Sequence, residues 1–94
     1  MAPLSKIAKL LRDGRVQSGL TQGEVARKLG YQTAQFVSNW ERGMTTPPGK
    51  TLRKLVDLYD LSHAIVYEAL LEYAIERAKQ TVREDYYGKV KGRH

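Results

Sequence analysis

The chain has 94 residues, enough for one domain whose hydrophobic core needs no metal or disulfide to hold it together. It contains no cysteine, which excludes a disulfide framework and a thiolate zinc site. The formal net charge of +6 and the pI near 9.7 favour an anionic partner.

No apolar run approaches the roughly twenty residues that span a bilayer, and no signal peptide follows Met1. We therefore expect a cytoplasmic protein with no membrane partner. The charge is distributed unevenly: residues 1–54 carry ten of the sixteen Lys and Arg against three acids, whereas residues 55–76 carry five acids and no Lys or Arg. The chain is basic again from Arg77. This polarity fits binding of a polyanion by the N-terminal part.

The first helix is predicted from Pro3 to about Gln17, because proline suits a first helical turn and Ser18-Gly19 ends the pattern. Its inward face is an apolar repeat of Leu4, Ile7, Ala8 and Leu11.

The second helix is short and has strong signals at both ends. Thr21 and Glu24 form a capping box, T-x-x-E, that satisfies two backbone N–H groups. Gly30 ends the helix, since glycine takes the left-handed conformation at no steric cost. The inward stripe between them consists of Val25, Ala26 and Leu29.

A third short helix is predicted to begin at Thr33 as N-cap and to close at Gly43. Its inward stripe is Phe36, Val37 and Trp40. An ordinary solvent-facing helix would carry Glu and Lys on its outer face, but this one carries side chains that can donate to and accept from base edges in a major groove. These outward positions are Ala34, Gln35, Ser38, Asn39 and Arg42.

Two further helices follow. Pro47-Pro48-Gly49 forbids helix, and a fourth helix starts near Lys50 with an apolar stripe of Leu52, Leu55, Val56 and Tyr59. Ser62 caps a fifth helix that can run as far as Tyr86. Its apolar stripe is Ile65, Val66, Ala69, Leu70, Tyr73 and Ala74, beside acidic Glu68, Glu72 and Glu76. The predicted fold is all-α with five helices.

The segment from Thr21 to Pro48 resembles the helix-turn-helix of phage Cro and cI-type repressors, the bacterial Xre family. The likeness extends from about Leu4 to Ser62. The sequence departs from the family pattern at one point. Val37 follows Ala26 by eleven positions, whereas the family usually has ten, and we interpret this as one extra residue in the Tyr31-Gln32 turn. The residues that carry the resemblance are Gly19-Leu20-Thr21-Gln22, Glu24-Val25-Ala26, Leu29-Gly30, Val37-Ser38-Asn39-Trp40-Glu41-Arg42-Gly43 and Pro47-Pro48.

The resemblance implies a lambda-repressor-like domain that binds double-stranded DNA, with the third helix reading bases. Base contacts are then expected from Ala34, Gln35, Ser38 and Asn39, with Gln35 suited to pair with adenine and Ala34 to pack on a thymine methyl. Phosphate contacts are expected from Thr21, Gln22, Thr33, Arg42, Thr45, Thr46 and Lys50. Ser38 can reach either a base or a phosphate.

The same resemblance assigns structural roles. Arg15 is expected to pair with Glu41, the alternative being a solvated arginine. Gln22 is expected to brace Gln35 besides holding a phosphate, the alternative being a plain surface glutamine. The expected structural set is Arg15, Glu41, Trp40, Val37, Ala26 and Gly30. Trp40 could stack on a ligand, but its register places it in the core. Phe36 could instead meet thymine methyls or the extra turn residue.

The long fifth helix has more apolar surface than a small globule covers, which predicts a two-fold homodimer; the alternative is a monomer with a frayed C-terminal third. We therefore divide the chain into residues 1–62 as the helix-turn-helix core, 63–87 as an extended dimerisation helix, and 88–94 as a disordered basic tail containing Lys89, Lys91 and Arg93. The expected dimerisation residues are Ile65, Val66, Ala69, Leu70 and Tyr73.

The sequence contains no pattern of residues that indicates a catalytic site. His63 and His94 stand alone, with no carboxylate cluster at ligand spacing, so we expect no metal, no cofactor and no enzyme activity. The favoured function is a dimeric repressor or autoregulator that reads a palindrome. The rivals are an antitoxin, whose long C-terminal helix would clasp a toxin protein, and a non-enzymatic coactivator or scaffold with vestigial DNA binding.

Overall fold

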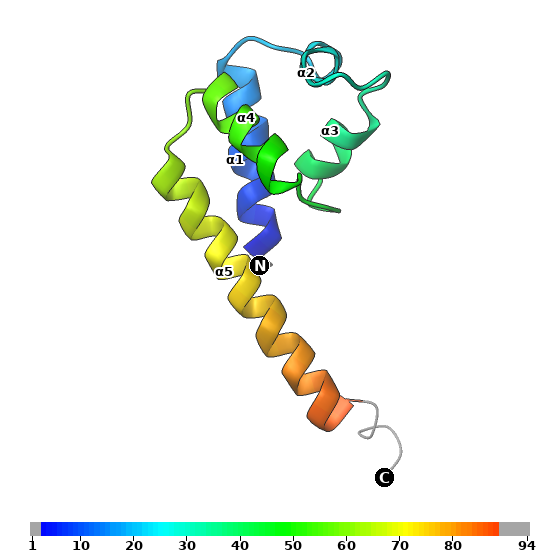
Figure 1. Cartoon of the computed structure of the whole chain (residues 1–94), viewed down its shortest axis with the longest axis vertical. Helices are drawn as coiled ribbons and strands as arrows, with labels where there is room; N and C mark the ends of the chain where they lie inside the picture. The colour runs from blue at the N-terminus through cyan, green and yellow to red at the C-terminus, as the bar shows by residue number, and fades with distance from the viewer. Residues whose placement is uncertain (1–2, 89–94) are drawn as a thin grey trace.

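The computed structural model describes residues 3–88, and within that range the secondary structure is entirely helical (Figure 1). The elements are α1 (Pro3–Gln17), α2 (Gln22–Leu29), α3 (Gln35–Glu41), α4 (Gly49–Leu58), α5 (His63–Arg83) and a π-helical turn, Glu84–Gly88. The predicted all-α, five-helix fold is confirmed. The predicted basic tail, with Lys89, Lys91 and Arg93, lies outside the described residues.

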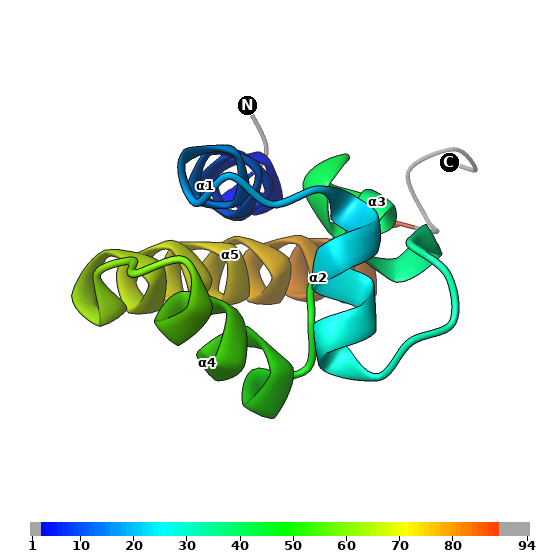
Figure 2. The same cartoon turned by 90° about the horizontal axis from the view of Figure 1, so that it is seen from above.

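The helices form a small globule from which α5 projects. In both views α2 and α3 lie together on one side of α1 and α4 (Figures 1 and 2). The first part of α5 packs along α1 and also touches α4, whereas its second part runs well past the end of α1. The molecule is accordingly elongated, with principal extents of 53 × 28 × 21 Å.

The predicted boundaries of α2 are confirmed. The backbone N–H of Glu24 donates to the Thr21 hydroxyl at 3.0 Å, and the Thr21 N–H donates to the Glu24 carboxylate at 2.9 Å. This backbone hydrogen bond is the main cause that lowers the pKa of Glu24. Gly30 ends the helix with φ of +88°, the left-handed conformation that favours glycine.

The predicted N-cap of α3, Thr33, is wrong by one residue. The helix begins at Gln35 with Ala34 as its N-cap, and no side chain caps it. Thr33 lies one position earlier, where its hydroxyl accepts a hydrogen bond from the Gln35 N–H at 3.3 Å. The Tyr31 N–H still donates to Ala26 O at 2.9 Å, as part of the end of α2. The chain reverses only after Tyr31, so the turn includes Thr33 and α3 begins later than predicted.

The core is a single cluster shared by all five helices. Val37 and Trp40 of α3 are 1% and 4% exposed, so the prediction that Trp40 belongs to the core is confirmed. Phe36, predicted first as an inward residue, is 54% exposed. Its ring instead lies 5.0 Å from the ring of Tyr31, the turn residue that covers the edge of Trp40. The other core residues are Ile7, Leu11, Val25, Ala26, Leu52, Leu55, Val56, Tyr59, Val66 and Ala69.

An ion pair joins α1 to α3. Arg15 Nε lies 2.7 Å from Glu41 Oε2 and Arg15 Nη2 lies 3.0 Å from Glu41 Oε1, so the predicted pair is present in bidentate form. The side chains are only 15% and 4% exposed. The third nitrogen, Nη1, donates to Leu20 O at 2.8 Å, which also ties down the segment that leads into α2.

The surroundings of the pair alter two pKa values. The hydrogen bonds to Glu41 raise the pKa of Arg15 against an opposing effect of burial. Burial raises the pKa of the neighbouring Tyr59 to about 12, and the negative charge of Glu41 adds to this rise. Arg15 and Tyr59 therefore keep their ordinary protonation states throughout the neutral range.

The five residues predicted to form a dimer interface have a different role in the fold. Val66 and Ala69 are 4% and 2% exposed because they fill the core of their own chain. Leu70 and Tyr73 are half-buried against the same core. Only Ile65, at 55% exposure, is open to solvent. This stripe of α5 therefore faces the globule and is not available to a second copy as predicted.

We predict opposite effects for two helical glycines. A Cβ at Gly14 of α1 would lie 3.1 Å from Tyr59 Cβ, an atom fixed by its backbone, so Gly14→Ala should destabilise the protein by about 1–2 kcal/mol despite the better helix propensity of alanine. At Gly23 of α2 the nearest atom is 3.8 Å away, so Gly23→Ala should stabilise it by roughly 0.5–1 kcal/mol. Urea unfolding measures both, and equal stabilisation would contradict the packing at Gly14.

We also predict that the Arg15–Glu41 pair is critical to stability. Glu41→Ala leaves the guanidinium of Arg15 unpaired in a largely buried position, which should cost about 3–5 kcal/mol of unfolding free energy. The control is Asp13→Ala, which removes the exposed pair between Lys9 and Asp13 and should cost much less. Similar losses in the two variants would show that the buried pair contributes little.

Candidate nucleic-acid interface

The surface of interest is the outward face of α3. Val37 and Trp40 hold the opposite face in the core, while contacts with α1 and α2 fix the helix from both sides. Because the inner residues are anchored, the side chains one turn apart on the outside are presented in a fixed register. Helix α3 lies on the same side of the molecule as α2 (Figure 1).

Three outward side chains form a hydrogen-bonded row along α3. Gln35 Nε2 donates to Asn39 Oδ1 at 3.0 Å, and Arg42 Nη2 donates to the same oxygen at 3.0 Å. The three residues follow each other at spacings of four and three, so they lie above one another on the helix. Asn39 thus accepts a hydrogen bond from both Gln35 and Arg42, and the three polar side chains are ordered in the free protein.

The row leaves the groups needed for base recognition available. A glutamine amide has two N–H groups and a carbonyl oxygen, and the bond to Asn39 uses one N–H. The other N–H and the carbonyl form the edge that pairs with N7 and N6 of adenine. Gln35 is also exposed. Its position is therefore compatible with the base contact expected from the sequence.

The remaining expected base-contact residues, Ala34, Ser38 and Asn39, are all half-buried. Ala34 also packs partly against the core. The methyl group of Ala34 is therefore less open than the sequence pattern suggested. Thr33, expected at a phosphate, is exposed beside the start of α3.

Gln22 does not brace Gln35 as expected. Its Nε2 donates to Glu41 Oε1 at 3.0 Å, so it joins the Arg15–Glu41 pair and connects α2 to the end of α3. The partner of Gln35 is Asn39 instead. The physical reason is that Glu41 offers a charged acceptor at the α2–α3 contact, and a hydrogen bond to a charged group is stronger than one between two neutral amides.

The start of α2 offers groups that can hold a phosphate. Thr21 and Glu24 satisfy each other through the capping box, whereas the N–H groups of Gln22 and Gly23 have no hydrogen-bond partner within residues 3–88. Such free N–H groups at a helix N-terminus favour anions. Thr21, also expected at a phosphate, is exposed next to them.

A second group of expected phosphate contacts follows α3. Gly43, with φ of +76°, turns the chain into the loop that carries Thr45 and Thr46, and Lys50 is exposed at the start of α4. The hydroxyl of Thr46 has a long bond of 3.4 Å to Pro47 O and the residue is half-buried, so it is less available than Thr45.

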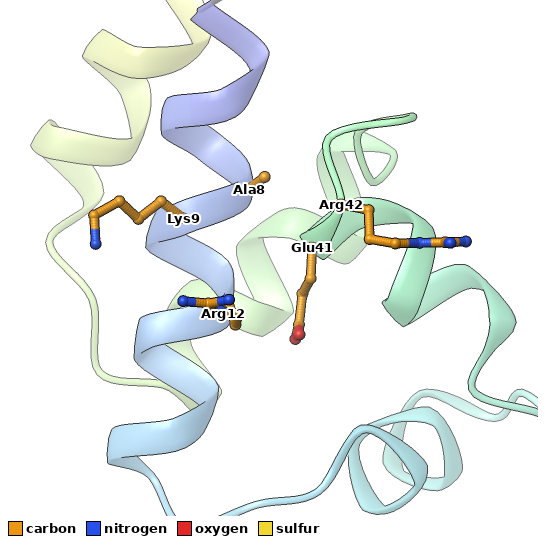
Figure 3. A pocket seen from close by; sticks show the side chains of 5 residues that line it. All are labelled: Ala8, Lys9, Arg12, Glu41 and Arg42. Atoms are coloured by element: carbon orange, nitrogen blue, oxygen red, sulfur yellow. The ribbon is translucent and has the colours of Figure 1, made fainter.

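The fold adds two basic residues that the sequence pattern did not assign. Lys9 and Arg12 of α1 line an open hollow of about 310 Å³ together with Ala8, Glu41 and Arg42. Figure 3 shows the Arg42 side chain extending away from α1 and the Lys9 side chain extending to the opposite side. Lys9 and Arg12 are thirty or more residues from Arg42 in sequence, so their nearness is a result of tertiary packing alone.

Other site types find no support among the described residues. Within residues 3–88 no group of three or more His, Asp or Glu is placed to hold a metal ion. No helix in the described part of the chain is long and apolar enough to cross a membrane.

Comparison with known proteins gives one match. The family model described as helix-turn-helix, HTH_3, matches residues 11–66, which is more than half of the 94 residues and includes α2, α3 and α4 entirely. The search of curated proteins and the search of solved structures found no match. Together with the five-helix fold and the polar face of α3, this match shows that the chain belongs to the Cro/C1-type helix-turn-helix family of DNA-binding transcription regulators.

Proposed function

We propose that the protein is a sequence-specific regulator, a repressor or autoregulator, that reads a palindromic operator as a dimer with α3 in the major groove of double-stranded DNA. The observation that carries this proposal is the row Gln35–Asn39–Arg42 on the exposed face of α3. A recognition helix of this family places its N-terminal residues against base edges, and Gln35 is the first residue of α3.

The two ends of the row are suited to different contacts with DNA. Gln35 has the amide edge for a base, whereas Arg42, at the other end, has a positive charge suited to a phosphate. Both are held by Asn39, so the base contact and the backbone contact are oriented relative to each other. Ordering these side chains in the free protein lowers the entropy lost on binding.

The α2 N-terminus supports a second backbone contact. The available N–H groups of Gln22 and Gly23, with the Thr21 hydroxyl beside them, would grip one phosphate, and Thr33, Thr45, Thr46 and Lys50 would contact others. These groups set the register of the protein on DNA and carry no sequence information themselves.

The composition of the α3 face argues against a scaffold with vestigial DNA binding. The exposed positions from Gln35 to Arg42 are Gln35, Phe36 and Arg42, and half-buried Ser38 and Asn39 lie between them, so this face contains no Glu or Lys. A face that had lost its nucleic-acid partner would gain from the charged residues that favour helix and solubility.

The direct test is selection of bound duplexes from a random DNA pool at physiological salt, with the mass of the complex recorded. A two-fold symmetric motif bound by two chains would support the proposal. Salt-sensitive binding with no enriched motif would contradict it, since phosphate contacts alone give that behaviour.

We predict that two substitutions in the row act differently. Gln35→Ala should lose roughly 1–3 kcal/mol of discrimination at one base pair and leave non-specific binding nearly unchanged. Arg42→Ala should weaken binding to every sequence and reduce the salt slope by about one phosphate. Titrations of operator and unrelated DNA at several salt concentrations measure both effects. Identical behaviour of the two variants would mean that α3 is not placed as proposed.

We further predict that Asn39 acts through Gln35. Asn39→Ala removes the oxygen to which Gln35 donates, so it should weaken discrimination at the same base pair as Gln35→Ala. The effects should not add: a double-mutant cycle should give a coupling energy of about 0.5 kcal/mol or more. Simple additivity would show that the bond between the two amides is not used in recognition.

A further inference from the structure

Helix α5 has a second apolar face that the globule leaves uncovered. Its exposed large residues are Tyr67 at 63%, Leu71 at 44%, Ile75 at 47% and Val82 at 65%. Ala74 and Ala78, also exposed, fall between them. With about 100° of rotation per residue, these positions form one continuous band, which we call the outer stripe, centred about 160° around α5 from the buried Val66 and Ala69.

The outer stripe is too long to be covered by its own chain. It extends along the part of α5 that projects past α1 (Figure 1). At its upper end it meets a mainly apolar hollow of about 300 Å³ between α4 and α5, which Tyr67 and Leu70 line. A connected exposed apolar surface of this kind marks an interaction site.

The spacing of the outer stripe is nearly the same in both directions from Ile75, differing by one residue. Leu71 and Ala78 lie four residues before and three after it, and Tyr67 and Val82 lie eight before and seven after. Two copies of α5 laid antiparallel, with Ile75 at the two-fold axis, would therefore set apolar residue against apolar residue along the whole stripe.

The charges beside the outer stripe fit the same arrangement. Glu68 and Glu72 precede Ile75 on one edge of the stripe, and Lys79 and Arg83 follow it on that same edge. All four are exposed. In an antiparallel pair the acidic half of each helix lies along the basic half of the other. In a two-fold parallel pair the charged edges of the two helices would lie on opposite faces of the dimer, so these four charges would not face their counterparts.

We propose that the outer stripe pairs with the same stripe of a second copy, antiparallel and two-fold about Ile75, with Glu68 and Glu72 of each chain facing Lys79 and Arg83 of the other. This rests on the proposed function in taking a dimer as the DNA-binding form, and it names the face and direction of pairing. It replaces the stripe of Val66 and Ala69, which the chain buries in its own core.

The pairing is tested by charge reversal in the absence of DNA, with the dimer dissociation constant measured by sedimentation equilibrium. Glu68→Lys with Glu72→Lys should weaken the dimer about tenfold or more, and Lys79→Glu with Arg83→Glu should do the same. All four changes in one chain should restore it, because opposite charges face each other again. A parallel dimer would be unaffected by each reversal.

Matched controls separate this effect from others. Glu84→Lys is the same reversal at an exposed position on the other side of the helix from the outer stripe and its charged edge, and should leave the dimer unchanged. Lys6→Ala removes the surface salt bridge between Lys6 and Glu72, whose N–O distance is 2.8 Å, and should also leave the dimer dissociation constant unchanged. For the apolar contact, Ile75→Asn should weaken the dimer, whereas Ile65→Asn, at a similarly exposed isoleucine outside the stripe, should not.

Disulfide trapping tests the register, because the chain has no cysteine of its own. Ile75→Cys should crosslink with itself. Leu71→Cys should not, since its two copies would lie about 12 Å apart along the axis, but it should crosslink with Ala78→Cys in a mixture. Self-crosslinking of Leu71→Cys would overturn the antiparallel arrangement.

A monomer at all concentrations would also overturn the pairing and leave the outer stripe for another protein, such as a toxin. Such a result would not bear on base reading, because the discrimination lost by Gln35→Ala can also be measured on a duplex that contains a single half-site, which one chain binds. Failure of the pairing and failure of the proposed function are thereby distinguishable.

Discussion

The buried ion pair of Arg15 and Glu41 is the interaction on which the presentation of α3 depends. A helix of seven residues is too short to be stable in water without tertiary contacts. The pair fixes the C-terminal end of α3 to α1, and Gln22 connects the same carboxylate to α2. Three helices thus meet at one charged group whose hydrogen bonds are satisfied, so its burial does not leave an uncompensated charge.

This arrangement places the stabilising contacts of α3 on one side and leaves the other side free. Val37, Trp40 and Glu41 face the protein, while Gln35, Asn39 and Arg42 face outward. Within residues 3–88 the side chains of these three outward residues hydrogen-bond only to one another, so they can contact a ligand without disturbing the core. The short helix gains its rigidity from its inner side and its recognition chemistry from its outer side.

The long helix α5 has two apolar surfaces. One completes the core through Val66 and Ala69, and the other is the outer stripe. Residues on the two surfaces alternate along the chain, so the helix is apolar around most of its first half. The reversal of charge along one edge, from Glu68 and Glu72 to Lys79 and Arg83, gives the exposed surface a direction.

Much of the fold and part of the site could be predicted because their signals are local. The capping box of Thr21 and Glu24, the terminal Gly30 and the cap at Ser62 involve residues a few positions apart, so the sequence contains all the information they need. The apolar register likewise predicted that Trp40 is buried. The Arg15–Glu41 pair was predicted only through the family resemblance, because 26 residues separate its members.

Tertiary structure decided which of several possible partners each side chain takes. Gln22 could reach a neutral amide or a carboxylate, and the packing of α2 against α3 brought it to Glu41. Phe36 had an inward register, but the lengthened turn placed Tyr31 beside it and left it exposed. For α5 the sequence showed an excess of apolar residues, and only the position of α1 and α4 determined which of them became core. Periodicity fixes the angle between side chains on one helix, whereas the direction of the neighbouring helices is set by contacts between residues far apart in the chain.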